Sequence, residues 1–136
     1  MRQAIKKKEM RYRVLKWMGI VVLSPILWVF FVYFCRPVVV LHYSENASTR
    51  IGYFFNDNHD ITKRGLQPGE IVKFPTAMFP APDMWILLTF PTERGDSLEI
   101  TEPFSRIDVH ILEGGKIDRT VVRHGFFSRF TAPSSQ

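Results

Sequence analysis

The chain is short and poor in cysteine, with 136 residues, one cysteine and a formal net charge of +5. This length leaves room for one small folded domain beside a membrane segment, and a single cysteine excludes an intrachain disulfide. Residues 1–16 hold seven basic residues and one acidic residue (7 − 1 = +6), whereas residues 17–136 hold 11 basic and 12 acidic residues, a net charge of −1. A nearly neutral domain lacks the positive field that phosphate contacts need, so we expect no nucleic-acid binding.

Residues 17–35 are an apolar stretch without a charged residue, bounded by Lys16 and Arg36. As a helix these 19 residues would be about 28 Å long, close to the ~30 Å hydrocarbon core of a bilayer. The sequence therefore predicts one transmembrane helix with membrane lipid around it. A cleaved signal peptide, which would have a shorter apolar region and small residues at its end, is one alternative, and a buried core helix is the other.

The charges before the apolar stretch predict its orientation, because Lys and Arg that flank a membrane helix stay in the cytoplasm. We expect residues 1–16 to be a basic cytoplasmic segment and the chain from residue 37 onward to lie outside a bacterial inner membrane or an equivalent plasma membrane. Cys35 then lies at the outer membrane edge. It is either a small apolar residue or a disulfide link between two copies in a homodimer, with acylation as a third alternative.

Residues 37–125 have the pattern of an all-β domain. Short segments rich in β-branched and aromatic residues recur between turn residues: 38–43, 50–56, 71–74, 84–90, 97–101, 106–112 and 116–123. This spacing predicts a small antiparallel β-sandwich, Ig-like, of about seven strands. The first segment has the composition of a strand buried on both faces. In segment 106–112 the alternation places Ile107, Val109 and Ile111 inward and Asp108 and His110 outward.

Two segments carry large apolar residues at positions where they would add little to the stability of a monomer. One is a Pro-rich surface loop from Pro75 to Pro82, and the other is the C-terminal tail, residues 126–136. From these we predict a partner-binding surface formed by Met78, Phe79, Phe126, Phe127 and Phe130. For the tail, packing onto the domain and contact with the membrane surface are the alternatives.

The sequence contains no pattern that predicts catalysis or a cofactor. It has no phosphate-binding glycine motif, no nucleophile elbow and no His-x-x-x-His spacing, so we predict no catalytic residue and no metal site. Loop Asn56–Asp60 offers several oxygens to a hard cation such as Ca²⁺, but it lacks the layout of an EF-hand. A solvated turn stabilised by its Asn and Asp side chains is the preferred interpretation.

These observations favour a membrane-anchored protein whose outer domain acts as a binding or assembly module of an envelope or membrane complex, with a protein partner in or at the membrane. An alternative of another kind is an immunity or inhibitor protein that occludes a toxic enzyme in the periplasm. An enzyme ranks third, because no acid/base or nucleophile constellation is visible.

Overall fold

The structure is a computed structural model that describes residues 2–58, 60–79 and 81–125, with side chains from residue 9 onward. The chain divides into two compact units, Met1–Cys35 and Arg36–Gln136. We describe each unit on its own.

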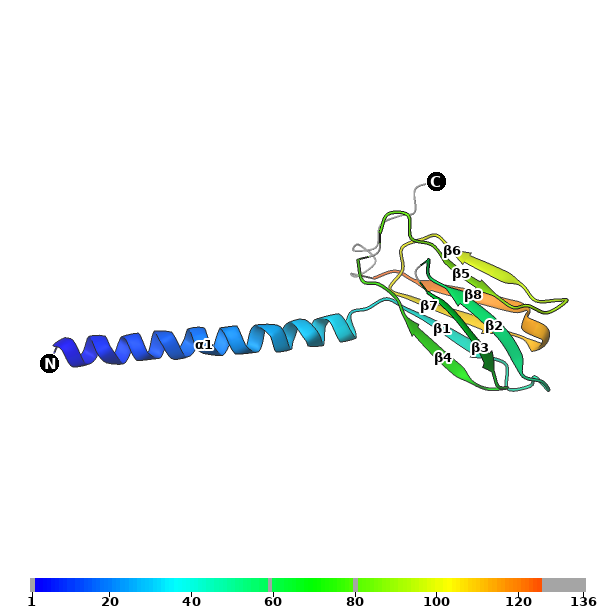
Figure 1. Ribbon diagram of the computed structural model, residues 1–136. Helices are drawn as coiled ribbons and strands as arrows, with labels where there is room; N and C mark the ends of the chain where they lie inside the picture. The colour runs from blue at the N-terminus through cyan, green and yellow to red at the C-terminus, as the bar shows by residue number, and fades with distance from the viewer. Residues whose placement is uncertain (1, 59, 80, 126–136) are drawn as a thin grey trace. The chain divides into compact units, whose positions relative to one another are not determined.

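The first unit is one long helix, α1 (Arg2–Phe34), which continues through Pro25 (Figure 1). The part Glu9–Phe34 is long and apolar enough to cross a membrane, and none of it is buried inside the protein. At 1.5 Å per residue the 33 residues of α1 measure about 50 Å, which exceeds the ~30 Å of a hydrocarbon core. The helix therefore includes the basic segment as well as the apolar stretch.

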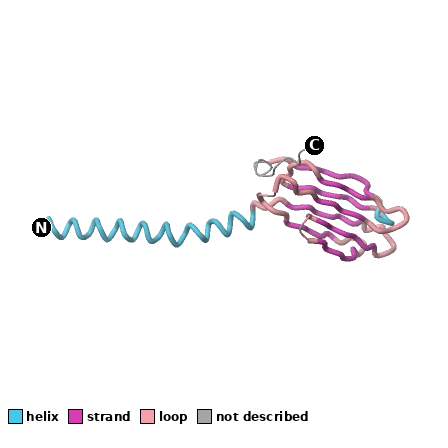
Figure 2. Tube along the Cα trace, turned by 45° about the horizontal axis from the view of Figure 1, so that its top comes forward, coloured by secondary structure: helices cyan, strands magenta, loops and turns pink. Residues whose placement is uncertain are grey.

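The described residues of the second unit form eight strands in two four-stranded sheets (Figures 1 and 2). Sheet A has the order β4-β1-β7-β8, and sheet B has the order β3-β2-β5-β6. In sheet A the strands are β1 (Val38–Tyr43), β4 (Ile71–Pro75), β7 (Arg106–Ile111) and β8 (Ile117–Arg123). In sheet B they are β2 (Ile51–Asn56), β3 (Ile61–Leu66), β5 (Ile86–Thr89) and β6 (Ser97–Ile100). A short 3₁₀ helix, η1 (Glu113–Gly115), connects β7 to β8.

One hydrophobic core joins the two sheets, because alternate residues of their strands point to the same side. Strand β1 contributes Val39 and Leu41, and β7 contributes Val109. From sheet B come Tyr53 and Leu88, and all five side chains are buried. The period-2 alternation predicted for segment 106–112 is thereby confirmed in β7, and β1 is buried on both faces as its composition predicted.

The predicted helix followed by an all-β domain is confirmed, with two differences in the strands. An eighth strand, β3, is present between the predicted segments 50–56 and 71–74, and β5 is shorter than the predicted segment 84–90. The arrangement is not wholly antiparallel, since β1 pairs in parallel with β7, Val38 opposite Arg106 and Tyr43 opposite Ile111. Every other strand pair is antiparallel.

The connections gather at two ends of the domain, which follow from the strand directions. We call the end at which β1 begins the proximal end. It carries the connections 57–60, 76–85 and 101–105 and residues 124–125. The opposite, distal end carries the connections 44–50, 67–70, 90–96 and 112–116. The Pro-rich loop thus lies at the same end as the start of β1.

Candidate functional site

The outer face of sheet A, the side turned away from the core, has a buried centre. Val40 and Asp108 lie opposite each other on β1 and β7 and point outward, yet their exposed fractions are only 0% and 5%. Lys73 of β4 and Val121 of β8 complete this row. Part of the cover over Asp108 comes from the side chains of Arg106 and His42, which contact its carboxylate.

Asp108 is contacted by basic side chains from three strands. The guanidinium of Arg106 donates to both carboxylate oxygens, from Nη2 to Oδ1 at 2.7 Å and from Nε to Oδ2 at 2.8 Å. The ring of His42 contacts Oδ1 through Nε2 at 2.8 Å. Arg123 approaches Oδ2 with its Nε at 3.7 Å. Such a bidentate Arg–carboxylate pair fixes the position of both partners.

This packing shifts the protonation of two side chains. The hydrogen bonds from Arg106 hold the pKa of the Asp108 carboxyl well below its usual range, against the opposing effect of burial, and the hydrogen bond with His42 adds to the lowering. On the next row the ring of His110 stacks on that of His42, with centroids 4.7 Å apart. Burial lowers the pKa of His110, and the charge of Arg119 lowers it further. The site therefore favours an ionised Asp108 beside a neutral His110.

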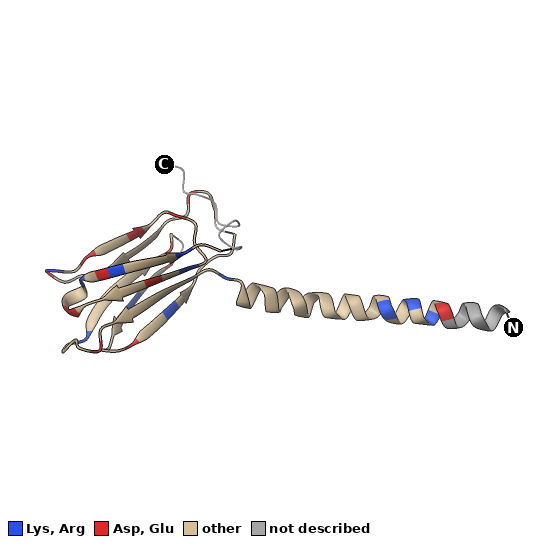
Figure 3. Cartoon of the chain, turned by 180° about the vertical axis from the view of Figure 1, so that it is seen from behind, with Lys and Arg blue, Asp and Glu red and all other residues tan. Residues whose placement is uncertain are grey.

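The rim of this face is positively charged. Lys73, Arg106, Arg119 and Arg123 point outward on this face. The opposing carboxylates are those of Asp108 and of Asp118 on β8, which acts on His110, so the balance is 4 − 2 = +2 without the histidines. Acidic residues are placed differently, because nine of the 12 acidic residues after the helix lie outside the strands. Figure 3 colours acidic residues red and basic residues blue. The outer face of sheet A is thus a preorganised cationic surface suited to an acidic partner.

This face contains a His–carboxylate pair. His42 and Asp108 form a pair of the kind that activates a nucleophile, but no Ser, Thr or Cys points outward from the four strands of sheet A. Among the described residues no group of three or more His, Cys, Asp or Glu side chains is placed to hold a metal ion.

The partner-binding surface predicted from the sequence is placed only in part. Met78 is buried, with 6% of its surface exposed, so the exposure expected for this residue is wrong. Its neighbour Phe79 is 60% exposed. Phe126, Phe127 and Phe130 lie outside the described residues.

Loop Asn56–Asp60 is stabilised by its own side chains. The Asn56 side-chain oxygen accepts the backbone N–H of Asn58 at 2.9 Å, and a carboxylate oxygen of Asp57 accepts that of Asp60 at 2.8 Å. Asn58 has a positive φ of 71°, which Asn tolerates better than most residues. These oxygens serve the turn, which is the interpretation preferred from the sequence.

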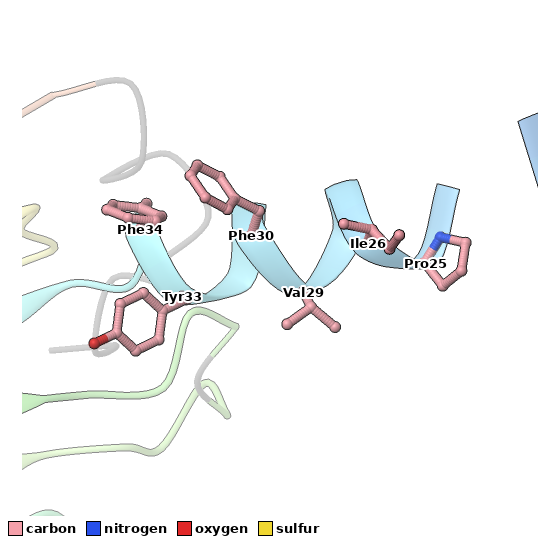
Figure 4. A pocket seen from close by; sticks show the side chains of 6 residues that line it. All are labelled: Pro25, Ile26, Val29, Phe30, Tyr33 and Phe34. Atoms are coloured by element: carbon pink, nitrogen blue, oxygen red, sulfur yellow. The ribbon is translucent and has the colours of Figure 1, made fainter. Parts of the chain in front are cut away.

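A shallow apolar recess lies on one side of α1 and is lined by Pro25, Ile26, Val29, Phe30, Tyr33 and Phe34 (Figure 4). The rings of Phe30 and Phe34 contact each other, with centroids 4.3 Å apart. No charged side chain lines the recess. In a bilayer such a surface contacts acyl chains.

Comparison with known proteins supplies no family. The chain matches no protein-family model, and neither the curated proteins nor the solved structures gave a match.

Proposed function

We propose that this chain is a single-pass membrane protein with its N-terminus in the cytoplasm and an Ig-like β-sandwich outside. In this proposal the outer domain acts as a non-catalytic protein-binding module of an envelope or membrane complex. The exposed apolar surface of Glu9–Phe34 supports the membrane anchor, since contact of this surface with water would be unfavourable. The charge of +6 on residues 1–16 supports the orientation.

The observation that carries the binding role is the fixed cationic face around Asp108. Its central carboxylate is already paired with Arg106, so little ordering remains when a partner docks. Arg119 and Arg123 remain exposed on the edge strand β8, where they are available to carboxylates of a partner. Anchoring raises the effective concentration of the domain toward a membrane-resident protein, so a modest affinity suffices.

Charge reversal on the two sheets tests the binding role. The full chain is crosslinked in intact cells and purified in mild detergent as the wild type, as Arg119→Glu/Arg123→Glu, and as the control Lys63→Glu/Arg64→Glu on edge strand β3. We expect the sheet A variant to lose a protein adduct that the sheet B variant keeps. Adducts that survive equally in both variants would contradict the assignment of the binding face.

Protease accessibility tests the orientation. Protease added to intact spheroplasts should digest the domain after residue 36 and leave residues 1–16 protected, because an intact bilayer separates the two. Protection of the domain until lysis would reverse the proposed topology.

A further inference from the structure

We propose that the outer edge of strand β8 binds an extended acidic segment of a partner protein, which adds one strand to the four-stranded sheet A. This inference deepens the proposed function and rests on it, because it uses the same cationic face. It adds two things: the partner is held by backbone pairing along β8, and it carries a defined pattern of side chains.

Strand β8 ends sheet A on one side. It pairs with β7 along one edge, and among the described residues no strand pairs with its other edge. An unpaired edge presents backbone N–H and C=O groups to which another strand can bond. Of the four edge strands of the described domain, β8 is the longest, with seven residues, and it contains neither Pro nor Gly. The other three are shorter, β3 contains Gly65, and β4 ends at Pro75.

The side chains of β8 are incompletely covered on both faces of the sheet. Val121 lies opposite Asp108 on the outer face and is 39% exposed. Val122 lies opposite the buried core residue Ile107 and therefore points to the core side, yet it is 37% exposed. A strand added beside β8 would cover both valines, so pairing along this edge also removes apolar surface from water.

The outer row of β8 selects the partner by charge. Arg119 and Arg123 flank Val121 on the outer face. The side chain of Arg123 is 64% exposed, and its Nε lies 3.7 Å from Oδ2 of Asp108, a long contact. Asp118 has no opposite residue in β7, because the register shifts there. The regular part of the strand, residues 119–123, thus carries two cations and no anion, which carboxylates at cross-strand positions would complement.

The same charges argue against a second copy of this chain as the occupant. Pairing of two β8 strands would bring four arginines together with only two aspartates. Lys116 and His124, which flank the strand, supply no carboxylate either. The occupant that fits this edge is therefore an acidic segment of another protein.

The spacing of the two arginines specifies the partner's side-chain pattern. Paired residues of adjacent strands point to the same face of a sheet, so the carboxylates must stand opposite Arg119 and Arg123, four residues apart. Apolar residues between them would cover Val121 and Val122. The expected motif is therefore an acidic residue, three β-branched or other apolar residues and a second acidic residue. This pattern is symmetric and fits either strand direction.

Peptide binding to the full chain in phosphatidylcholine nanodiscs tests this inference. The probe is a fluorophore-labelled synthetic peptide, Thr-Glu-Val-Val-Val-Glu-Thr. Two further peptides have the same sequence with N-methyl groups on alternate amides, one on the third and fifth and one on the fourth and sixth. In an added strand only one of these two sets faces β8, so the two peptides have equal charge but differ in the pairing that they allow.

The proteins compared are the wild type, Arg119→Glu/Arg123→Glu, and the control Lys63→Glu/Arg64→Glu on β3. We expect the wild type and the control to bind the unmodified peptide and one methylated peptide in anisotropy titrations. The other methylated peptide, and the sheet A variant, should show binding weakened by about tenfold or more. By NMR hydrogen exchange, the β8 amides that do not pair with β7 should exchange rapidly in the free protein. Their exchange should slow by about tenfold when the peptide saturates the domain.

Equal affinities of the two methylated peptides would overturn strand addition and leave the cationic face intact. Binding that survives in the sheet A variant would come from other cations, such as the basic segment 1–16, and would also overturn it. Slow exchange along both edges of β8 before the peptide is added would mean that the chain itself or a second copy already occupies the edge. Failure of every peptide to bind rejects the inference, while crosslinking in cells still tests the proposed function separately.

Discussion

The Nε2 atom of His42 lies 2.8 Å from Oδ1 of Asp108, a residue 66 positions later on the parallel neighbouring strand. With the two hydrogen bonds from Arg106, this contact makes Asp108 the electrostatic centre of sheet A. We predict that Asp108→Asn lowers the free energy of unfolding by about 1–3 kcal/mol, because Arg106 loses a charged acceptor in a partly buried place. Denaturant unfolding of the full chain in micelles measures the effect.

The matched control for that variant is Asp118→Asn, an exposed aspartate on β8. It should change the free energy of unfolding by less than about 0.5 kcal/mol. Similar losses in the two variants would mean that the Asp108 network contributes no more than an ordinary surface charge.

The pH dependence of stability should contain a contribution from His110. Its pKa is lowered in the folded protein, chiefly by burial and then by Arg119 and His42, while Asp108 and Asp118 oppose the shift. The unfolded chain therefore binds the proton more readily, and stability falls as the pH drops below the ordinary histidine pKa of about 6.5. We predict that His110→Gln flattens the dependence of the unfolding midpoint on pH between 7 and the folded pKa.

Asp108 affects stability in a separate, more acidic pH range. Because its pKa is lowered in the folded protein, it stabilises the fold fully above about pH 4, the ordinary carboxyl pKa. That stability is lost as the pH falls toward the pKa of the folded state. An unchanged slope near neutral pH in His110→Gln would contradict the assignment.

Two buried tyrosines should respond oppositely to removal of the hydroxyl. The hydroxyl of Tyr53 is buried and has no hydrogen-bond partner among the described residues, whereas that of Tyr43 donates to the carbonyl oxygen of Thr49 at 2.7 Å. Tyr53→Phe should leave stability unchanged or raise it, because an unpaired polar group leaves the core. Tyr43→Phe should lower the free energy of unfolding by about 1 kcal/mol. Thermal unfolding of the two variants measures these changes. A clear loss of stability in Tyr53→Phe would indicate a hydrogen-bond partner for the Tyr53 hydroxyl.

Two adjacent glycines between β7 and β8 allow the cost of backbone strain to be measured apart from the cost of a steric clash. Gly114 and Gly115 both have positive φ, 78° and 83°, but a Cβ on Gly114 meets no atom within 4 Å while one on Gly115 lies 2.6 Å from the Cβ of buried Phe90. Gly114→Ala should cost about 1–2 kcal/mol from the left-handed backbone alone. Gly115→Ala should cost about 1–3 kcal/mol more, because Phe90 must move. Equal unfolding midpoints for the two variants would refute the clash.

Local patterns were sufficient to predict much of this fold. The uncharged run before Arg36 predicted an apolar helix, and the alternation around Val109 predicted which residues of that strand enter the core. Strand β3 was missed because Lys63, Arg64 and Gly65 give it the composition of a loop. As an edge strand it needs few buried side chains, and charged residues there discourage pairing with other chains.

The candidate site was harder to predict because it depends on contacts between distant parts of the chain. Alternation placed Asp108 correctly on the outer side, but nothing local shows that Arg123 and His42 come from neighbouring strands to cover it. The parallel pairing of β1 with β7 joins residues more than 60 positions apart. Burial of Met78 likewise depends on how the loop packs, which a Pro-rich composition does not specify.

The position of β1 inside its sheet has a mechanical consequence. This strand, the first after the helix, is bonded on one side to β4 and on the other to β7. Tension entering at Pro37 along the strand axis therefore loads two rows of interstrand bonds in shear, all at once, instead of opening them one at a time from an edge. Strand β1 should therefore resist such a load better than a strand at the edge of a sheet.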